Sequence, residues 1–314
     1  MKRVIIDTDM GIDDAHAVLM ALLSPDIQVE GFTTVFGNTE VEYCTRNVLH
    51  TLELVGKTEI PVYQGAASRL VGKDWEDGKE VHGKCGLGEL KIHEPKTRPA
   101  KGNAIQWLVE TVLSAPNEIE VLALGPLTNV ALASLIEPQW AKAIKRIIFM
   151  GGIISGPGNV RPLSTATIFN DAEAAKIVFH RGYPIVMVGQ DVTRHALLTP
   201  AYRERMRVAD TPVTRFLDSV TDFYEGFYTD RDPTLKGKGI PIHDMLVIAY
   251  SLRPSLFTTE RLYVTVETEG RITRGQTVPD WRPFSENQPQ MDVCLDVNKE
   301  ALFELYLEIV TARL

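Results

Sequence analysis

Short apolar runs alternate with helical patterns along the first part of the chain. The segments between the runs repeat apolar residues at the spacing of an amphipathic helix. Strands that alternate with helices indicate an α/β fold, a doubly wound and mainly parallel sheet with helices on both faces. The predicted strands are residues 4–6, 29–35, 119–124, 147–150 and 185–188, and the predicted helices are residues 15–23, 40–55, 103–114 and 172–179.

Two long segments, residues 65–101 and 151–170, interrupt this alternation. Loops of such length in a compact enzyme are usually functional, so we expect both to form walls of a site. Residues 211–238 join an aromatic-rich helical stretch to a glycine-rich approach to His243, which would suit a mobile lid. Nothing in the pattern indicates a linker or repeat, so residues 1–314 are predicted to form one domain. Later strands are predicted at residues 262–267 and 291–295, and a closing helix at residues 299–314.

Composition agrees with a globular enzyme. The chain has 314 residues, of which 44% are hydrophobic and 24% charged, enough to bury a large core. Its net charge of −8 and the lack of a basic run argue against a nucleic-acid partner. No apolar stretch is long enough to span a bilayer, and Met1-Lys2-Arg3 leads straight into a strand, so we expect a cytoplasmic protein without a membrane partner. Three scattered cysteines form neither a disulfide framework nor a zinc pattern.

Four carboxylates follow the first predicted strand: Asp7, Asp9, Asp13 and Asp14. At the end of a buried strand they repel one another unless a cation or a polyol neutralises them, which favours a Ca²⁺ site that also binds a sugar. A plain alternative is that the last two acids only cap the following helix. An EF-hand loop is excluded because its twelfth position, counted from Asp7, is Val18 where a Glu is required. A phosphatase with Asp7 as nucleophile stays open on this motif alone.

Further polar or glycine-rich motifs follow other predicted strands. They are Thr33–Asn38, Leu124–Asn129, Met150-Gly151-Gly152 and, before a late helix, Ile242-His243-Asp244. In a doubly wound sheet, ligands bind beyond the carboxyl ends of the strands, where all these motifs are expected to lie. A phosphatase would leave Asn38 and His243-Asp244 unexplained, and the glycines at 151–158 lack the Gly-Lys-Ser/Thr of a P-loop.

Together these motifs resemble those of the inosine-uridine nucleoside hydrolases, in the same order and over nearly the whole chain. The resemblance implies hydrolysis of the N-glycosidic bond of a nucleoside, Ca²⁺ as cofactor, and a homo-oligomer, either a tetramer or a dimer. It assigns the metal to Asp9, Asp14, Asp244 and the backbone carbonyl of Leu124. A Ca²⁺-bound water would attack the anomeric carbon, with Asp9 taking its proton. Asp7 would orient its neighbours.

The same resemblance assigns substrate contacts. Asp13 and Asn38 would bind the vicinal ribose hydroxyls. Met150, in the Met150-Gly151-Gly152 motif, is a further candidate for contact with the substrate. His243 would act as general acid or electrophilic contact for the leaving base, and His82 would contact the base. Tyr224 and Tyr228 are candidates for lining the base pocket, although aromatic residues at helical spacing are more often core. His195 and Trp281 are interpreted as structural.

One motif departs from the family pattern. Relatives carry a Glu-Phe-Asn triplet whose Glu and Asn hold sugar hydroxyls, notably the 5′-hydroxyl. Here Asn159 is kept, but Thr165-Ala166-Thr167 stands in place of the triplet. Losing a carboxylate that accepts from a buried hydroxyl costs about 1–3 kcal/mol unless Thr165 or a water substitutes.

Several interpretations of this departure stay open at the level of sequence. The substrate could be a riboside modified at the 5′ position, with Arg161 facing an anionic group. The chain could be a specialised hydrolase of ordinary nucleosides, or the pair Phe169-Asn170 could shift to supply the missing amide. A non-catalytic, Ca²⁺-dependent nucleoside-binding protein is a further alternative. Purine, pyrimidine and unusual bases are all compatible with the motifs.

Overall fold

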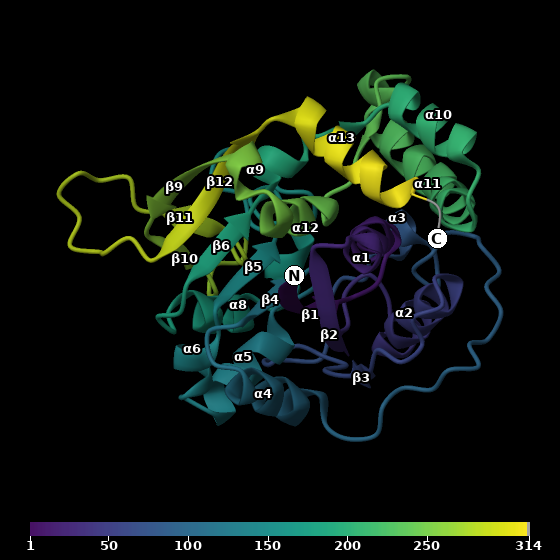
Figure 1. The fold of residues 1–314 in the computed structure, drawn as a ribbon. Coiled ribbons are helices and arrows are strands. Elements are labelled where there is room, and N and C mark those ends of the chain that lie inside the picture. Colours follow the sequence, from purple (N-terminus) through teal and green to yellow (C-terminus); the bar gives the residue numbers. More distant parts are fainter. Residues whose placement is uncertain (313–314) are drawn as a thin grey trace.

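The computed structural model describes residues 1–312, and an eight-stranded sheet forms its centre (Figure 1). Neighbouring strands of the sheet run parallel, except at one edge, where β9 is antiparallel to β12. The predicted fold class, a mainly parallel sheet covered by helices, is thereby confirmed. From one edge to the other the strands are β3 (Val62–Gln64), β2 (Ile27–Thr34), β1 (Lys2–Thr8), β4 (Ile119–Ala123), β5 (Arg146–Met150), β6 (Ile185–Val188), β12 (Met291–Val297) and β9 (Phe257–Leu262).

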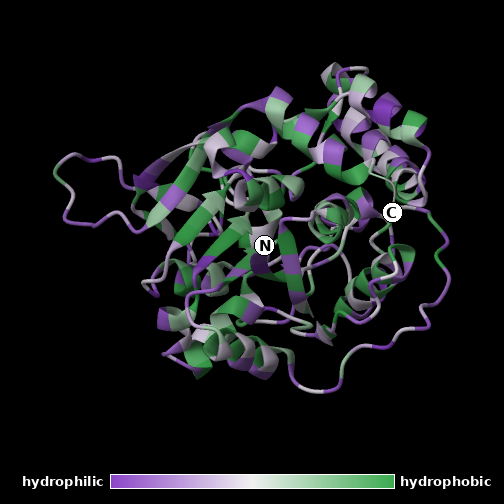
Figure 2. Ribbon diagram, in the orientation of Figure 1, coloured by the Kyte–Doolittle hydropathy of each residue, from purple (hydrophilic) through white to green (hydrophobic). Residues whose placement is uncertain are grey.

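Helices cover both faces of the sheet, which explains why its strands are apolar on both sides. Successive side chains of a strand point to opposite faces, so Val4 and Ile6 pack into one core cluster and Ile5 into the other. Figure 2 shows the hydrophobic residues concentrated on the central strands and the helices against them. One face carries α1 (Ile12–Leu23), α2 (Val41–Leu54), α10 (Pro200–Ala209), α11 (Pro212–Arg231), α12 (Met245–Leu252) and α13 (Lys299–Val310); the other carries α4 (Ala104–Ser114), α5 (Thr128–Ile136), α6 (Trp140–Ala143) and α8 (Ala172–Phe179).

The main disagreement with the sequence prediction lies near the far edge of the sheet. Residues 262–267 were predicted as one strand, but the structure divides this region between β9 and β10 (Val264–Val266). The middle of β9 is exposed, as is usual for an edge strand, so a search for apolar runs misses most of it. Two small antiparallel pairs complete the strands: β10 with β11 (Thr277–Pro279), and β7 (Leu197–Leu198) with β8 (Ile240–Pro241).

The two long loops contain short helices that position the site. The first contains α3 (Lys79–His82), and the second ends in α7 (Ala166–Asn170). A third short helix, α9 (Gln190–Thr193), follows β6, and the 3₁₀ turns are Pro233–Leu235 and Pro254–Leu256. The expected lid region is mostly the long helix α11, which packs on α1. The predicted closing helix extended to residue 314, whose last two residues lie outside the part that the structure describes. No helix within residues 1–312 combines the length and the apolar character needed to cross a bilayer.

Candidate active site

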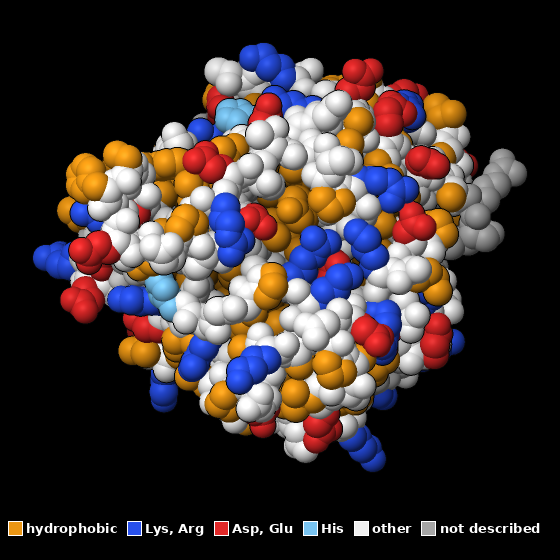
Figure 3. Space-filling view, turned by 60° about the vertical axis from the view of Figure 1, so that its left-hand side comes forward, with side chains coloured by type: hydrophobic (Ala, Val, Ile, Leu, Met, Phe, Trp, Pro, Cys, Tyr) orange, Lys and Arg blue, Asp and Glu red, His pale blue; other side chains and the backbone are white. Residues whose placement is uncertain are grey.

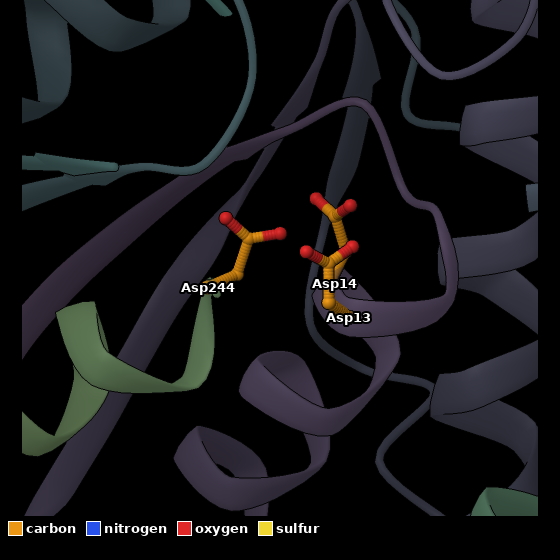
Figure 4. A group of neighbouring side chains, drawn as sticks. All are labelled: Asp13, Asp14 and Asp244. Carbon is orange, nitrogen blue, oxygen red and sulfur yellow. The ribbon is translucent and has the colours of Figure 1, made fainter. Parts of the chain in front are cut away.

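Three carboxylates meet beyond the end of β1. Asp13 and Asp14 come from the first turn of α1, and Asp244 comes from the residue before α12. Each offers an oxygen that lies within 4.8 Å of the others, and Figure 4 shows Asp244 facing the two carboxylates of α1. All three side chains are buried. Two segments far apart in the sequence therefore build one acidic centre, because α1 and α12 pack side by side.

Hydrogen bonds hold Asp14 and Asp9 at this centre. Asp14 accepts from the Thr8 hydroxyl, from the Gly11 N–H at 2.8 Å and from Asn38 Nδ2 at 2.9 Å. Asp9 Oδ2 accepts from the Asn38 N–H at 2.9 Å, so Asn38 links both acids. A Cβ at Gly37 would lie 2.0 Å from Asp9 Oδ2, which explains why glycine is needed here.

Asp7 is set apart from the other acids. Its carboxylate accepts from Thr33 and, at 2.7 Å, from Asn129 Nδ2, and its backbone carbonyl accepts from the Leu124 N–H at 2.8 Å. Burial raises the pKa of Asp7 to about 6. Asp7 thus links β1 to its two neighbouring strands and to α5, beneath the centre, and it does not line the cavity.

The electrostatics of the centre are unfavourable without a cation. Burial, and then the neighbouring carboxylates, raise the pKa of Asp9, Asp14 and Asp244, and burial raises that of Asp13 to about 6. Among residues 1–312, Asp13 Oδ1 is buried without a hydrogen-bond partner. The atoms that these side chains offer to a metal are all oxygens, which hard divalent cations prefer as ligands. A bound cation would lower the raised pKa values of the carboxylates. The residues present therefore fit a metal of this class.

Two histidines and two tyrosines lie beside the acids, and hydrogen bonds link Tyr224, Tyr228 and His243. The Tyr228 hydroxyl lies 2.9 Å from His243 Nε2, and the Thr193 hydroxyl lies 2.7 Å from His243 Nδ1. Tyr224, one turn earlier on α11, donates to Asp13 Oδ2 at 3.2 Å. His82 Nδ1 accepts from the Ile12 N–H at 3.0 Å. Both tyrosines, for which a core role was the more common expectation, line the cavity, and Tyr224 also belongs to a core cluster.

Both histidines are neutral at physiological pH. Burial lowers the pKa of His82 to about 4 although nearby Asp14 acts to raise it, and burial together with the nearby His82 ring lowers the pKa of His243 to about 3. Because Nδ1 of His82 accepts a hydrogen bond, its proton lies on Nε2, where it is available to a ligand. This side of the site therefore offers neutral hydrogen-bond donors.

Thr165-Ala166-Thr167, the motif that departs from the family pattern and is called the departure motif below, lies across the site from the histidines and tyrosines. Thr167 lies beside Met150, with its hydroxyl 3.8 Å from the Met150 sulfur. Asn159 Oδ1 accepts from the Ala166 N–H at 3.0 Å. Thr165 is buried, and its hydroxyl accepts from the Gly152 N–H at 2.8 Å instead of facing the cavity. Thr165 is thus the one predicted substrate contact that does not line the cavity.

A cavity of about 1020 Å³ brings most of the other predicted residues together; Asp14 belongs to the acidic centre but does not itself line the cavity. The histidine and tyrosine wall is built by α3, α11 and the start of α12, which belong to the α1 face of the sheet. The opposite wall is built by residues 151–170, whose α7 adjoins α8 on the other face. The predicted residues that line the cavity are Asp9, Asp13, Asn38, His82, Leu124, Met150, Asn159, Thr167, Tyr224, Tyr228, His243 and Asp244.

Several cavity residues were missed by the sequence reasoning. Glu76, Gln190 and Arg194 line the cavity, and so does His195, which was interpreted as structural. Asn170, which the sequence analysis considered as a source of the missing amide, also lines the cavity, and its side chain bonds to the Glu76 backbone. Most of them lie in the long loops or on the short helix α9, where no strand end marks them. Trp281 is 54% exposed and belongs to no core cluster. Figure 3 shows basic and acidic side chains interspersed over one face of the molecule.

Comparisons with known proteins give one consistent answer. The model of a family described as inosine-uridine preferring nucleoside hydrolase matches residues 4–304. A probable uridine nucleosidase 2 of Arabidopsis thaliana is 38% identical over 315 residues, covering 98% of this chain and 97% of the relative. A solved plant nucleoside hydrolase is 34% identical with a TM-score of 0.94, covering 99% of both chains. A purine-preferring ribonucleoside hydrolase from Gardnerella vaginalis is 31% identical with a TM-score of 0.93, covering 99% of this chain and 98% of that one.

The expectation drawn from the motifs is therefore confirmed at the level of family. The match spans nearly the whole chain, and the acidic centre, the histidines and the surrounding cavity lie at the strand ends where the fold predicts a ligand. The chain belongs to the inosine-uridine preferring nucleoside hydrolase family and is an N-glycosyl hydrolase acting on nucleosides.

Proposed function

We propose that this chain hydrolyses the N-glycosidic bond of ribonucleosides, releasing a free base and ribose, with Ca²⁺ as cofactor. The observation that carries the proposal is a buried group of carboxylates inside a cavity whose adjoining wall holds neutral histidines. The acids suit a cation and the sugar, and the histidines suit the leaving base.

Asp9, Asp14, Asp244 and the backbone carbonyl of Leu124 would hold the cation. A bound Ca²⁺ would fix the two vicinal ribose hydroxyls and a water, and would make that water more acidic. Asp9 would accept the proton that the attacking water loses. Asp13 would bind a ribose hydroxyl, since its Oδ1 is buried without a partner among the described residues. Asn38, which donates to both Asp9 and Asp14, would keep them oriented.

Cleavage develops positive charge on the ribose ring and negative charge on the base. Clustered carboxylates in a buried site stabilise a ribosyl cation, because electrostatic interactions are strong where water is excluded. The base leaves more easily when a hydrogen-bond donor contacts the atom on which its negative charge develops. His82 has its proton on Nε2, and a His243 ring that donates from Nε2 to the Tyr228 oxygen leaves the Tyr228 O–H free for the base.

We propose ribonucleosides as a class and not one base. The relatives are described as acting on uridine and on purines, and both kinds of base fit the volume of the cavity. A riboside altered at its 5′ position is the second candidate, favoured by Thr165 and Thr167 in the departure motif. Cytoplasmic location and assembly as a tetramer or dimer stay predictions.

Ribose release from a panel of purine, pyrimidine and 5′-modified nucleosides tests the proposal. We expect turnover that a chelator abolishes, that added Ca²⁺ restores, and that Asp9→Ala lacks. Turnover that persists in the chelator would contradict the metal assignment. Ca²⁺ and nucleoside binding without release of ribose from any substrate would favour the non-catalytic binding protein.

A further inference from the structure

Residues 151–170, which form the wall opposite the histidines, contain no carboxylate that could accept from a sugar hydroxyl. In a ribonucleoside the base is on C1′ and the hydroxymethyl arm is on C4′, at opposite ends of the 2′,3′-diol. A diol on the acidic centre and a base toward His82 and His243 place this arm at the wall built by residues 151–170. A buried hydroxyl needs a partner there.

The departure motif supplies no carboxylate there and only neutral acceptors, which bind a hydroxyl less strongly. The Thr165 hydroxyl is occupied by the Gly152 N–H and does not reach the cavity. The Thr167 hydroxyl is directed at the Met150 sulfur, which is a weak acceptor. Asn159 Oδ1 already accepts from the Ala166 N–H, and its Nδ2 has no such constraint and can donate to a ligand.

A carboxylate from the other long loop lies at the same end of the cavity. Glu76 lines the cavity, and its backbone is fixed on both sides by Asn170. Its N–H donates to Asn170 Oδ1 at 3.1 Å, and its carbonyl accepts from Asn170 Nδ2 at 2.9 Å. The preceding Trp75 packs on Phe36 with ring centroids 5.3 Å apart, which anchors the loop close to the acidic centre.

The Glu76 side chain is fixed as well. Both of its carboxylate oxygens accept from Arg161, one of them at 2.8 Å. The Arg161 guanidinium in turn lies 4.6 Å from the centroid of the Phe169 ring. Two-pronged pairing with an arginine uses one lone pair of each oxygen, so each oxygen can still accept from a hydroxyl. Arg161 is already neutralised and is not a free cation for an anionic group.

We propose that Glu76 is the specificity-determining residue for the 5′-hydroxyl of the substrate, with Arg161 and Asn170 as positioning residues. The hydroxyl donates to Glu76 and accepts from Asn159 Nδ2, which satisfies both of its roles. Because Glu76 already pairs with Arg161, this pair offers no free cation to a 5′-phosphate, so the preferred substrate has a free 5′-hydroxyl. This inference rests on the proposed hydrolysis of ribonucleosides.

The experiment compares kcat/KM for a ribonucleoside and for its 5′-deoxy analogue. We expect the unmodified protein to prefer the hydroxyl by about tenfold to a hundredfold, the size of one buried hydrogen bond to a charged group. Glu76→Ala should bring this ratio close to one, and Glu76→Gln should lower it only in part because the amide oxygen still accepts, with the loss of kcat/KM falling on the substrate that carries the hydroxyl. A general structural defect would lower both rates, so the ratio separates the two effects.

Glu80→Gln is the matched control. Glu80 also lines the cavity and pairs with an arginine, Arg231 at 2.9 Å, but that partner lies at the end of α11 on the other wall. Its substitution should leave the ratio as it is in the unmodified protein. The nucleoside 5′-monophosphate completes the panel, and it should be a poorer substrate than the nucleoside.

Three outcomes would overturn the inference. Ribose release with an unchanged ratio in Glu76→Ala would remove Glu76 from specificity and leave the proposed function intact. A preference for the 5′-monophosphate that Arg161→Ala abolishes would assign this wall to an anionic group. No ribose release from any substrate would overturn the proposed function and this inference together.

Discussion

The Tyr228 hydroxyl lies 2.9 Å from Nε2 of His243, and both side chains line the cavity beside the acidic centre. Burial raises the pKa of Tyr228 and lowers that of His243 to about 3, so both groups are neutral near pH 7. With its proton on Nε2, His243 donates to the Tyr228 oxygen and accepts from Thr193 at Nδ1, which leaves the Tyr228 O–H free. The pair can therefore present one hydrogen-bond donor to a leaving base.

The first prediction concerns this pair. Tyr228→Phe should lower kcat for natural nucleosides by roughly 10²-fold, the lower range of general acid catalysis, because the leaving base loses assistance. A riboside with a nitrophenyl leaving group needs no such assistance and should react at nearly the same rate in both proteins. An equal loss on both substrates would contradict a role at the leaving base.

The second prediction concerns the cation. Asp244 lies among buried carboxylates, and burial followed by its acidic neighbours raises its pKa. In a chelator, Asp244→Asn should raise the melting temperature because it removes a repelling charge. Added Ca²⁺ should raise the melting temperature of the unmodified protein, since a ligand that binds only the folded state stabilises it. Calorimetry with and without Ca²⁺ measures both effects.

In Asp244→Asn the Ca²⁺-dependent rise should be strongly reduced. A Ca²⁺ response as large as that of the unmodified protein would argue against Asp244 as a ligand. A lower melting temperature of this variant in the chelator would argue against mutual repulsion in the acidic centre.

The third prediction compares two glycines. A Cβ at Gly37 would lie 2.0 Å from Asp9 Oδ2, whereas a Cβ at Gly56 would meet nothing within 4 Å. Gly37→Ala should displace Asp9 and lower kcat/KM by roughly 10²-fold, as a small misplacement of a catalytic group does. Gly56 has φ +69°, so Gly56→Ala should cost about 1 kcal/mol of stability but little activity. Near-normal activity of a folded Gly37→Ala protein would contradict this view of Asp9.

The fourth prediction concerns stability at the opposite end of the sheet. Glu120 is buried on β4, where it pairs with Lys145 at 3.1 Å and Arg146 at 3.0 Å and accepts from Ser251 at 2.7 Å. Glu120→Gln should reduce the free energy of unfolding at pH 7 by about 1–3 kcal/mol, less than for a fully buried pair because both cations are partly exposed. Activity should stay the same. Chemical denaturation of both proteins measures the difference.

This difference should depend on pH in a defined direction. Burial acts to raise the pKa of Glu120, but the Arg146 and Lys145 charges and the Ser251 hydroxyl outweigh it and lower the pKa below the ordinary 4.5. The stabilisation is therefore present above about pH 4.5 and is lost as the pH falls through the lowered value in the folded state. A difference between the two proteins that grows on acidification would contradict this assignment.

Much of the fold could be predicted from local pattern. The predicted bounds of β6 and α8 are those of the structure, because an apolar run or an amphipathic period depends only on neighbouring residues. The edge strand β9 could not be found in this way, since its middle residues are exposed and its pairing with β12 is non-local. The burial of Thr165 was equally hidden, because its partner is the N–H of Gly152 in the turn after β5.

The sequence by itself determined the family, the α/β architecture and most residues of the acidic centre, because strand ends in a parallel sheet must meet at one edge. Only the tertiary structure decided which side chains from the long loops enter the cavity. Glu76 and Arg161 are far apart in the chain and lie in loops without periodic pattern, so nothing local marks them as partners. Their pairing arises where the two loops pack together, and it forms the wall that we propose receives the 5′-hydroxyl.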